Sequence, residues 1–215
     1  MKKILFFICI FMLIFSVSAF AGVEELTDED YLRDDFGFKD YDKYETPSID
    51  LKGSEWPEGT TVICYESPYN PRKNVSRDNK YVNIPESVVI ISDWAFEKRH
   101  LNDDCVDFTK LTNLKYIGQW AFEKGFFSRI DLSKTQLIRV GSYAFPECYT
   151  KTVILPDTIK RIDSHAFGNV RAASIELPEG LEYIGDGAFR CIRSAVIPKS
   201  VKYLGVDVFH DTAIH

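Results

Sequence analysis

The chain has 215 residues, of which 45% are hydrophobic and 27% are charged, the composition of one globular domain with a small appendage. Its mean hydropathy of -0.15 excludes a polytopic membrane protein. The formal net charge of -6 argues against a nucleic-acid binder, because such a protein needs a basic face to displace counterions from phosphates.

Residues 1–21 have the features of a secretory signal peptide. Two lysines at positions 2 and 3 precede an unbroken run of twelve apolar residues at 4–15. That run is too short for a stable membrane anchor, which takes about 20 residues. Because Ala19-Phe20-Ala21 matches a small-x-small cleavage site, we expect the mature protein to start near residue 22 and to leave the cytoplasm. The periplasm, the cell surface and the medium stay open as destinations, and no transmembrane anchor is expected in the mature chain.

Segment 22–50 is strongly acidic. It holds eleven Asp and Glu against three Lys and Arg, so its net charge is 3 − 11 = −8, whereas residues 51–215 hold 21 of each sign. Aromatic residues are scattered through it, among them Tyr31 and Phe36, without a clear period. The segment is interpreted as a flexible acidic leader or a loosely docked N-terminal arm. A partner-binding tail or a calcium-attracting patch are the alternatives, although no spacing matches a twelve-residue calcium loop.

Residues 51–80 are expected to cap the repeats that follow. The sequence Thr-Thr-Val-Ile-Cys-Tyr at 60–65 predicts an extra strand that would cover the first repeat. A terminal repeat needs such a cover, since an unpaired strand edge invites aggregation.

From residue 81 to residue 215 the chain repeats itself. An Ala-Phe pair recurs five times and then once as Val-Phe, and its Phe residues are spaced by 26, 23, 22, 22 and 20 positions. A Leu-Pro or Ile-Pro pair, as at Leu177-Pro178, and an Ile-Gly-like pair, as at Ile184-Gly185, recur in the same register. Self-similarity near 22 residues is typical of a solenoid, here with about six repeats of 22–23 residues.

The copy at 173–189 shows how one repeat is expected to fold. Ile175 and Leu177 alternate with Glu176, the period of a strand with one buried face, and Pro178 ends that strand. Gly185 is expected to supply a turn conformation closed to most residues. Ala188-Phe189 then fills the coil with one small and one bulky side chain, and stacked copies bury a continuous column between parallel strands about 4.8 Å apart.

These three recurring markers resemble those of the BspA-like (Treponema pallidum-type) leucine-rich repeat family. The resemblance covers residues 81–209; the second and third copies lack the Pro, and the first Phe spacing requires an insertion near residues 99–104. It implies a right-handed coil with short parallel strands on secreted or surface proteins, which are linked to adhesion and protein–protein contact. Fold alone does not fix function.

Four cysteines remain in the mature chain, and no catalytic motif is present. Cys148 and Cys191 follow Ala-Phe pairs two coils apart, so about 10 Å of stacking separates them, beyond the ~7 Å limit for a disulfide. We interpret both as buried thiols, whereas a Cys64–Cys105 disulfide stays open. Without metal-ligand spacing, a phosphate loop or a nucleophile motif, we expect no enzyme activity, no metal and no cofactor.

The candidate binding residues are the outward side chains of the predicted strands. They are polar, acidic or β-branched groups that would form one flat face: Asn83, Asp107, Arg129, Asp131, Ile154, Glu176 and Val196. Extended faces of this kind bind proteins in other solenoids, although the β-branched members also suit strand geometry and the acids also suit a solvated edge.

The leading hypothesis is a secreted or surface-exposed binding module for a protein, with a glycan as the other partner class. The alternatives are an assembly protein that associates through the solenoid ends and a glycan-cleaving solenoid.

Overall fold

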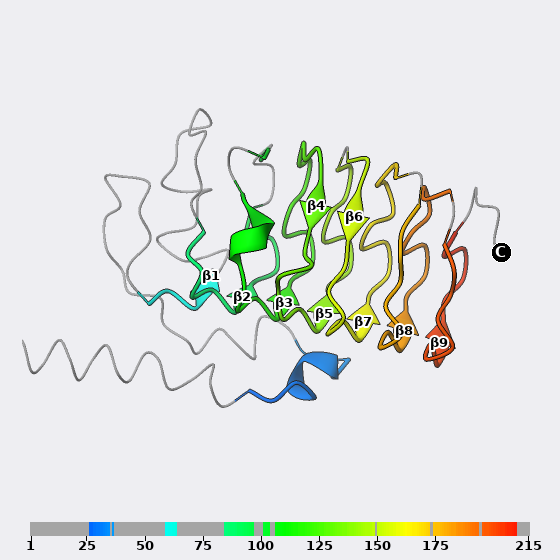
Figure 1. Ribbon diagram of the computed structural model, residues 1–215, viewed down its shortest axis with the longest axis horizontal. Helices are drawn as coiled ribbons and strands as arrows, with labels where there is room; N and C mark the ends of the chain where they lie inside the picture. Colours follow the sequence, from blue (N-terminus) through cyan, green and yellow to red (C-terminus); the bar gives the residue numbers. More distant parts are fainter. Residues whose placement is uncertain are drawn as a thin grey trace, which may run out of the picture.

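The computed structural model describes residues 26–34, 36, 59–63, 84–96, 101–103, 106–148, 150–172, 174–193 and 195–209. Over these ranges the chain forms a row of stacked coils, with short parallel strands in line along the stack (Figure 1). A repeat solenoid is therefore confirmed. The proposed signal peptide at 1–21, Asn83, Cys64 and Cys105 lie outside the described residues.

The main sheet has seven strands in the order β1-β2-β3-β5-β7-β8-β9, and every pair is parallel. Each strand is two residues long: Val62–Ile63 (β1), Ile90–Ile91 (β2), Tyr116–Ile117 (β3), Arg139–Val140 (β5), Arg161–Ile162 (β7), Tyr183–Ile184 (β8) and Tyr203–Leu204 (β9). The second residue of each strand points into the coil, and from β1 to β8 it is 0% exposed. The strand β1 is the extra strand expected at 60–65, and it covers β2.

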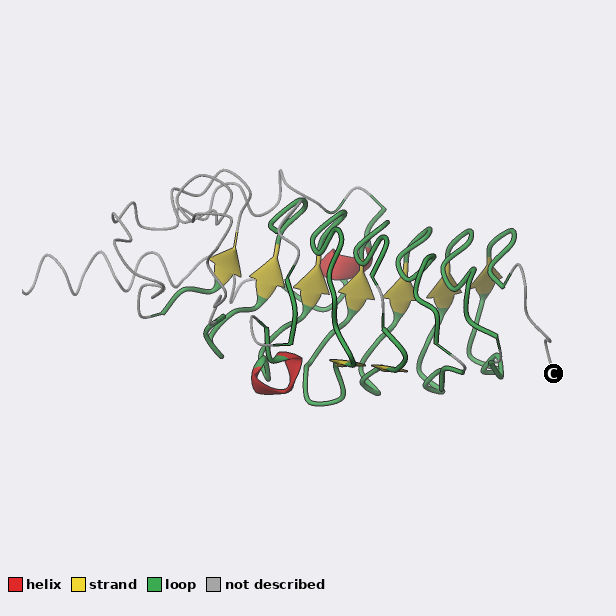
Figure 2. Ribbon diagram, turned by 90° about the horizontal axis from the view of Figure 1, so that it is seen from above, coloured by secondary structure: helices red, strands yellow, loops and turns green. Residues whose placement is uncertain are grey.

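The sheet lies at the Ile-Gly-like marker and not at the strand position expected from the sequence. At the expected position, within the described residues, β4 (Ile130–Asp131) and β6 (Val153–Ile154) pair, and an isolated bridge joins Ile175 to Ala195. This second ladder stays short because proline follows soon after it in the last three copies and cannot donate a ladder hydrogen bond. Figure 2 shows the two ladders on different sides of the coil. The short 3-10 helix η2 (Phe108–Lys110) precedes β4 on the side of the second ladder.

The marker glycines allow close approach between coils, so the role expected for Gly185 was wrong. Gly185 does not have a positive φ; instead, a Cβ atom there would lie 2.5 Å from the backbone nitrogen of Ser164 and 2.7 Å from the carbonyl carbon of Asp163. The equivalent Gly118, Gly141 and Gly205 meet the preceding coil's backbone in the same way. The absence of a side chain at these glycines therefore lets the backbones of neighbouring coils come close enough to form ladder hydrogen bonds.

Replacing Gly185 with Ala should destabilise the protein by about 1–3 kcal/mol, because the backbone of the preceding coil would have to move. Urea denaturation followed by circular dichroism measures this cost. Gly180→Ala is the control, since a Cβ atom there would lie 3.1 Å from the flexible end of Lys160 and 3.2 Å from the backbone oxygen of Asp157, farther than the backbone contacts at Gly185. Equal shifts of the midpoint in both variants would contradict the close-approach explanation.

The left-handed turn falls on the residue just before each Ala-Phe pair. In successive copies this position is Trp94, Trp120, Tyr143, His165, Gly187 and Asp207, with φ between 51° and 59°. Ring stacking supports the strained aromatic residues among them: Trp120 lies 4.7 Å from Tyr143, and Tyr143 lies 4.8 Å from His165. A side chain on Gly187 would meet the His165 ring, so glycine is suited to that position.

The core is a column of stacked phenylalanine rings, as the Ala-Phe repeat predicts. Phe122, Phe145, Phe167 and Phe189 are at most 1% exposed, with successive ring centroids 5.1, 5.2 and 5.8 Å apart. Phe96 and Phe209 extend the column at its two ends, at 5.3 and 5.6 Å.

Cys148 and Cys191 are both free thiols, as expected. Burial raises the pKa of the Cys148 thiol to about 12, so it stays protonated and packs as a small apolar group. Cys191 is only partly buried, so the burial expected for it was wrong.

Candidate binding face

The first residue of each main-sheet strand points away from the core. In strand register these residues are Val62, Ile90, Tyr116, Arg139, Arg161, Tyr183 and Tyr203, and we call this row the sheet face. Apolar, aromatic and cationic side chains follow one another along it. Because the strands are about 4.8 Å apart, adjacent members of the row are in contact distance of one another.

A segment from the acidic N-terminal region lies on the sheet face. Residues 26–34 and 36, which we call the arm, include the short 3-10 helix η1 (Asp30–Leu32), drawn in blue beside the strands in Figure 1. Tyr31 is 0% exposed and Phe36 is 4% exposed. Both pack in one cluster with Val62, Ile90, Tyr116 and Ile138. These residues of the acidic segment are thus packed against the solenoid.

Ring contacts fix the two aromatic side chains of the arm. The Phe36 ring meets the Tyr116 ring edge-on with centroids 5.0 Å apart, and it lies 5.0 Å from the Tyr31 ring. Edge-to-face pairs at this distance add to the free energy gained from burial alone. Tyr31 and Phe36 thus anchor the arm.

Two arginines of the sheet face bind the backbone of the arm. Arg139 Nη1 donates to the carbonyl oxygens of Tyr31 at 3.1 Å and of Arg33 at 2.7 Å. Arg161 Nη1 donates to the carbonyl oxygen of Leu32 at 3.3 Å. Because these acceptors are backbone atoms, the contacts depend on the conformation of the segment more than on its side chains.

Ion pairs join the two ends of the arm to Arg161 of the sheet face and to Lys115 just before β3. Arg161 Nη1 lies 2.7 Å from the Asp34 carboxylate, and Lys115 Nζ lies 2.7 Å from the Asp28 carboxylate. Asp34 is 89% exposed, so its pair contributes little by itself. Together the two pairs match an acidic segment to a basic surface.

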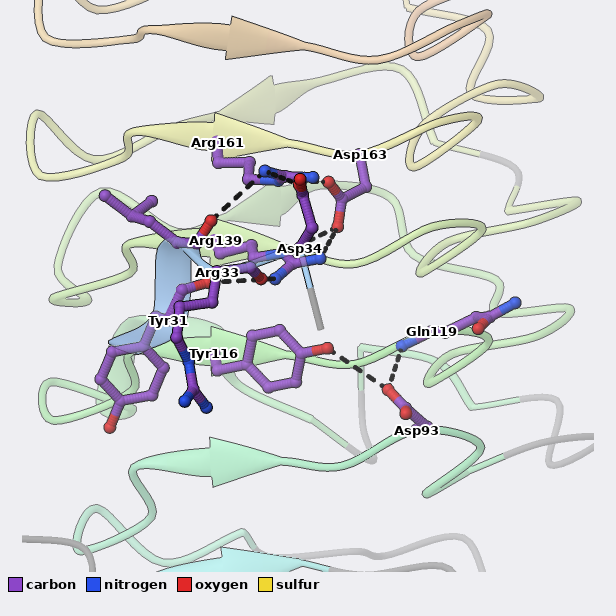
Figure 3. Close-up of polar contacts among 10 residues, drawn as sticks. Tyr31, Arg33, Asp34, Asp93, Tyr116, Gln119, Arg139, Arg161 and Asp163 are labelled. Atoms are coloured by element: carbon purple, nitrogen blue, oxygen red, sulfur yellow. Dashed lines mark hydrogen bonds and ion pairs between the residues drawn. The ribbon is translucent and has the colours of Figure 1, made fainter. Parts of the chain in front are cut away.

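A buried carboxylate holds both arginines in place (Figure 3). Asp163 accepts from Nε of Arg139 and from Nε of Arg161, each at 2.7 Å, and Nη2 of Arg139 also lies 2.7 Å from its carboxylate. The Arg139 and Asp163 side chains are each only 7% exposed. Burial acts to lower the pKa of Arg161, but the bonds and charge of Asp163 outweigh it and raise that pKa.

A second polar contact positions Tyr116. The Asp93 carboxylate accepts from the Gln119 backbone N–H at 2.7 Å and from the Tyr116 hydroxyl at 3.4 Å, as Figure 3 shows. Burial raises the pKa of the Tyr116 phenol far above its usual value, and the negative charge of Asp93 adds to the effect. Tyr116 therefore stays protonated and can donate to Asp93.

Beyond Arg161 the sheet face continues as a pair of stacked tyrosines. The Arg161 guanidinium lies 4.1 Å from the Tyr183 ring centroid, and the Tyr183 and Tyr203 rings stack at 4.5 Å. Tyr183 is half-buried and Tyr203 is 47% exposed. This end of the face offers flat aromatic surface next to a cation.

The residues chosen from the sequence lie along the second ladder. We call Asp107, Arg129, Asp131, Ile154, Glu176 and Val196 the side ladder. Asp131 pairs in register with Ile154, and Glu176 and Val196 follow the bridge between Ile175 and Ala195. Val196 is 71% exposed and Ile154 is half-buried.

The two aspartates of the side ladder serve as turn caps. Asp107 accepts from the N–H and the hydroxyl of Thr109, at 3.1 and 2.6 Å, and so caps η2. Asp131 makes the same bonds to Ser133, at 3.1 and 2.7 Å, and pairs with Arg129 at 2.7 Å. The hydrogen bonds from Thr109 lower the pKa of Asp107. For Asp131, burial acts to raise the pKa, but the bonds from Ser133 and the charge of Arg129 outweigh it, so the pKa is lowered. Both carboxylates thus have a local structural role.

A comparison with protein-family models matches the chain to the BspA type leucine-rich repeat region, in six copies over residues 74–138 and 115–215. The chain belongs to this family. No curated protein matches the chain.

The BspA-type leucine-rich repeat is a scaffold for protein interaction that is typically extracellular or at the cell surface, and it is typically non-enzymatic. In the part of the chain that the structure describes, no helix is long and apolar enough to cross a membrane. Within the same residues, no group of three or more His, Cys, Asp or Glu side chains could hold a metal ion.

Sequence reasoning missed the sheet face, although a signal for it was present. The residue before the Ile-Gly-like marker is Tyr116, Arg139, Arg161, Tyr183 and Tyr203 in five consecutive copies. Tyrosine and arginine are the side chains that most often anchor protein interfaces. The sequence pattern predicts a turn at the marker, and the side chain before a turn has no predictable direction.

Proposed function

We propose that this BspA-type repeat protein is an extracytoplasmic, non-enzymatic module that binds another protein through its sheet face. One observation carries the proposal: this face already binds a polypeptide segment, since Arg139 donates to the backbone of Tyr31 and Arg33 from more than 100 positions away. The face combines guanidinium donors for backbone carbonyls with an apolar cluster for aromatic side chains. These are the groups that dominate binding energy in protein interfaces.

The location and the kind of partner are part of the same proposal. The pattern of residues 1–21 supports export, and the family supports an extracellular or surface setting. A protein of a host or neighbouring cell is then the expected partner, as in adhesion, with a glycan as the other class. Binding without catalysis agrees with the lack of a nucleophile or phosphate motif in the sequence.

The side ladder is a second proposed surface for the same function. Val196 and Ile154 offer apolar area, and Glu176 offers an exposed carboxylate. Asp107 and Asp131 are poor probes of it, because changing either would also remove a turn cap. Glu176 and Val196 test this surface cleanly.

A binding assay on the mature chain against purified matrix and serum proteins separates the two surfaces. We expect Tyr183→Ala and Tyr203→Ala together to weaken binding at least tenfold, since both tyrosines are accessible and adjoin Arg161. Glu176→Ala with Val196→Ala is the matched surface control, and circular dichroism should be unchanged in both double variants. Loss of binding only in the control pair would move the site to the side ladder.

Binding unaffected by either pair of changes would argue against both surfaces. Static light scattering on the same samples tests the assembly alternative, because a mass that grows with protein concentration would favour association of the chain with itself. A constant monomer mass with partner binding supports the proposed module.

A further inference from the structure

We infer that the partner of the sheet face presents an acidic segment with two aromatic anchors, and that the arm competes with it for the same contacts. This inference rests on the function proposed above and adds the chemistry of the ligand. The arm is the guide, because it is a polypeptide already bound to the face by both its backbone and its side chains.

The first requirement on the partner is a pair of aromatic side chains. In the arm, Tyr31 and Phe36 are five positions apart and fill the apolar part of the sheet face over Val62, Ile90 and Tyr116. Both rings are almost completely buried. A segment without such rings would leave this apolar surface in water, at a cost of about 25 cal/mol per Å².

The second requirement is negative charge outside the aromatic anchors. Residues 26–36 contain five acidic residues and one arginine, a net charge of 1 − 5 = −4. Arg161 of the sheet face pairs with Asp34, and Lys115, which lies just before β3, pairs with Asp28, each at 2.7 Å. Asp163 neutralises part of the arginine charge, so the surface attracts acids without being strongly basic.

The third requirement is a short turn whose carbonyl oxygens point toward the sheet face. The helix η1 and the residue after it place three consecutive carbonyls, those of Tyr31, Leu32 and Arg33, at the guanidinium groups of Arg139 and Arg161. Asp30 stabilises the turn by accepting from the N–H and hydroxyl of Thr27, and these bonds lower the pKa of its carboxyl group. A partner segment therefore needs a short turn between its anchors.

The arm sets the affinity that a partner must exceed. A tethered segment acts at an effective concentration in the mM range. If the arm leaves the sheet face free in about 1% of molecules, the apparent affinity for a partner is about 100-fold lower than for a face that is always free. Tyr183 lies against Arg161 and stacks on Tyr203, so the two rings offer further contact area. A partner that also covers these rings gains affinity that the arm contacts described above do not provide.

Fluorescence anisotropy with a labelled peptide of residues 26–36 tests the inference. The full mature chain is compared with two variants that release the arm, Tyr31→Ala/Phe36→Ala and Asp28→Lys/Asp34→Lys. We expect both variants to bind the peptide more tightly than the wild-type chain, by at least tenfold for the alanine variant, which removes the two buried rings. The charge-reversed variant leaves the aromatic residues in place, so it keeps the test valid if the alanine variant does not fold.

Specificity is tested on the released chains. A further Arg161→Glu change should weaken peptide binding at least tenfold, whereas Arg193→Glu, an exposed arginine off the sheet face, should leave it unchanged. A peptide with alanine at both aromatic positions and a scrambled peptide of the same charge should both bind at least tenfold more weakly. Equal binding of the scrambled peptide would mean general charge attraction and would overturn the inference.

The remaining outcomes separate this inference from the proposed function. If released chains bind no peptide while a partner protein still depends on Tyr183 and Tyr203, the ligand chemistry is wrong and the function stands. If the wild-type chain alone instead forms dimers in light scattering, the occupant is the arm of a second copy, and a separate partner segment is overturned. Peptide binding with the stated specificity supports the inference.

Discussion

Replacing Phe167 with Ala should destabilise the protein by about 3–5 kcal/mol, the usual cost of truncating a fully buried aromatic side chain. Phe167 is 0% exposed and stacks on Phe145 and Phe189 at 5.2 and 5.8 Å. The change would open a cavity in the middle of the column, where neither neighbouring coil can close it without breaking its own backbone ladder. Thermal and urea denaturation measure the loss.

Phe126→Ala is the matched control for this experiment. The Phe126 side chain is 50% exposed, so its truncation should change the free energy of unfolding by less than about 1 kcal/mol. If Phe167→Ala cost no more than the control, the ring column would not be the main source of stability. Because each coil is stabilised mostly by its neighbours, the damage should spread to adjacent copies in hydrogen exchange.

Replacing Asp163 with Asn should cost about 3–5 kcal/mol, since it removes the charge that faces two guanidinium groups and leaves Arg139 buried without its counter-ion. The change keeps the size of the side chain, so packing alone predicts almost no loss. The Arg139–Asp163 contact is made at 2.7 Å by side chains that are each 7% exposed. Urea denaturation at neutral pH gives the value.

Two further variants separate charge from packing in this experiment. Asp157→Asn removes an exposed carboxylate near the same coil and should be close to neutral. Combining Asp163→Leu with Arg139→Met removes both members of the buried pair and should cost less than Asp163→Asn alone, because Arg139 no longer stays buried without its counter-ion and Arg161 keeps its ion pair with Asp34. A double variant as damaged as the sum of its single variants would show that the two groups are not coupled.

Periodicity predicted the solenoid because each marker reports a local packing requirement. The Ala-Phe pair needs a small and a bulky side chain at the same depth in every coil, and both are buried in every copy. The extra strand at Val62–Ile63 was also predictable, since it is a short β-branched run before the first copy. Neither prediction depends on which chain segments pack against the outer surface of the solenoid.

The position of the main sheet could not be predicted in the same way. Both Val153–Ile154 and Arg161–Ile162 are short extended pairs, and period-two alternation over so few residues does not say which will form the longer ladder. The choice depends on how closely neighbouring coils approach at Gly118, Gly141 and Gly185. That approach is a contact between residues more than 20 positions apart, so it became visible only once the coils were stacked.

The sequence by itself determined the repeat, its ring column and the family, because these follow from side-chain size and period within one copy. Only the tertiary structure decided the candidate site, because the site needs Arg139, Arg161 and Asp163 in neighbouring coils together with Tyr31 from the acidic segment. Charge and composition marked that segment as unusual but gave no reason for it to meet one face of the solenoid. Its docking follows from a match of aromatic rings, carbonyl oxygens and charges that exists only after the coils have placed their outward side chains in a row.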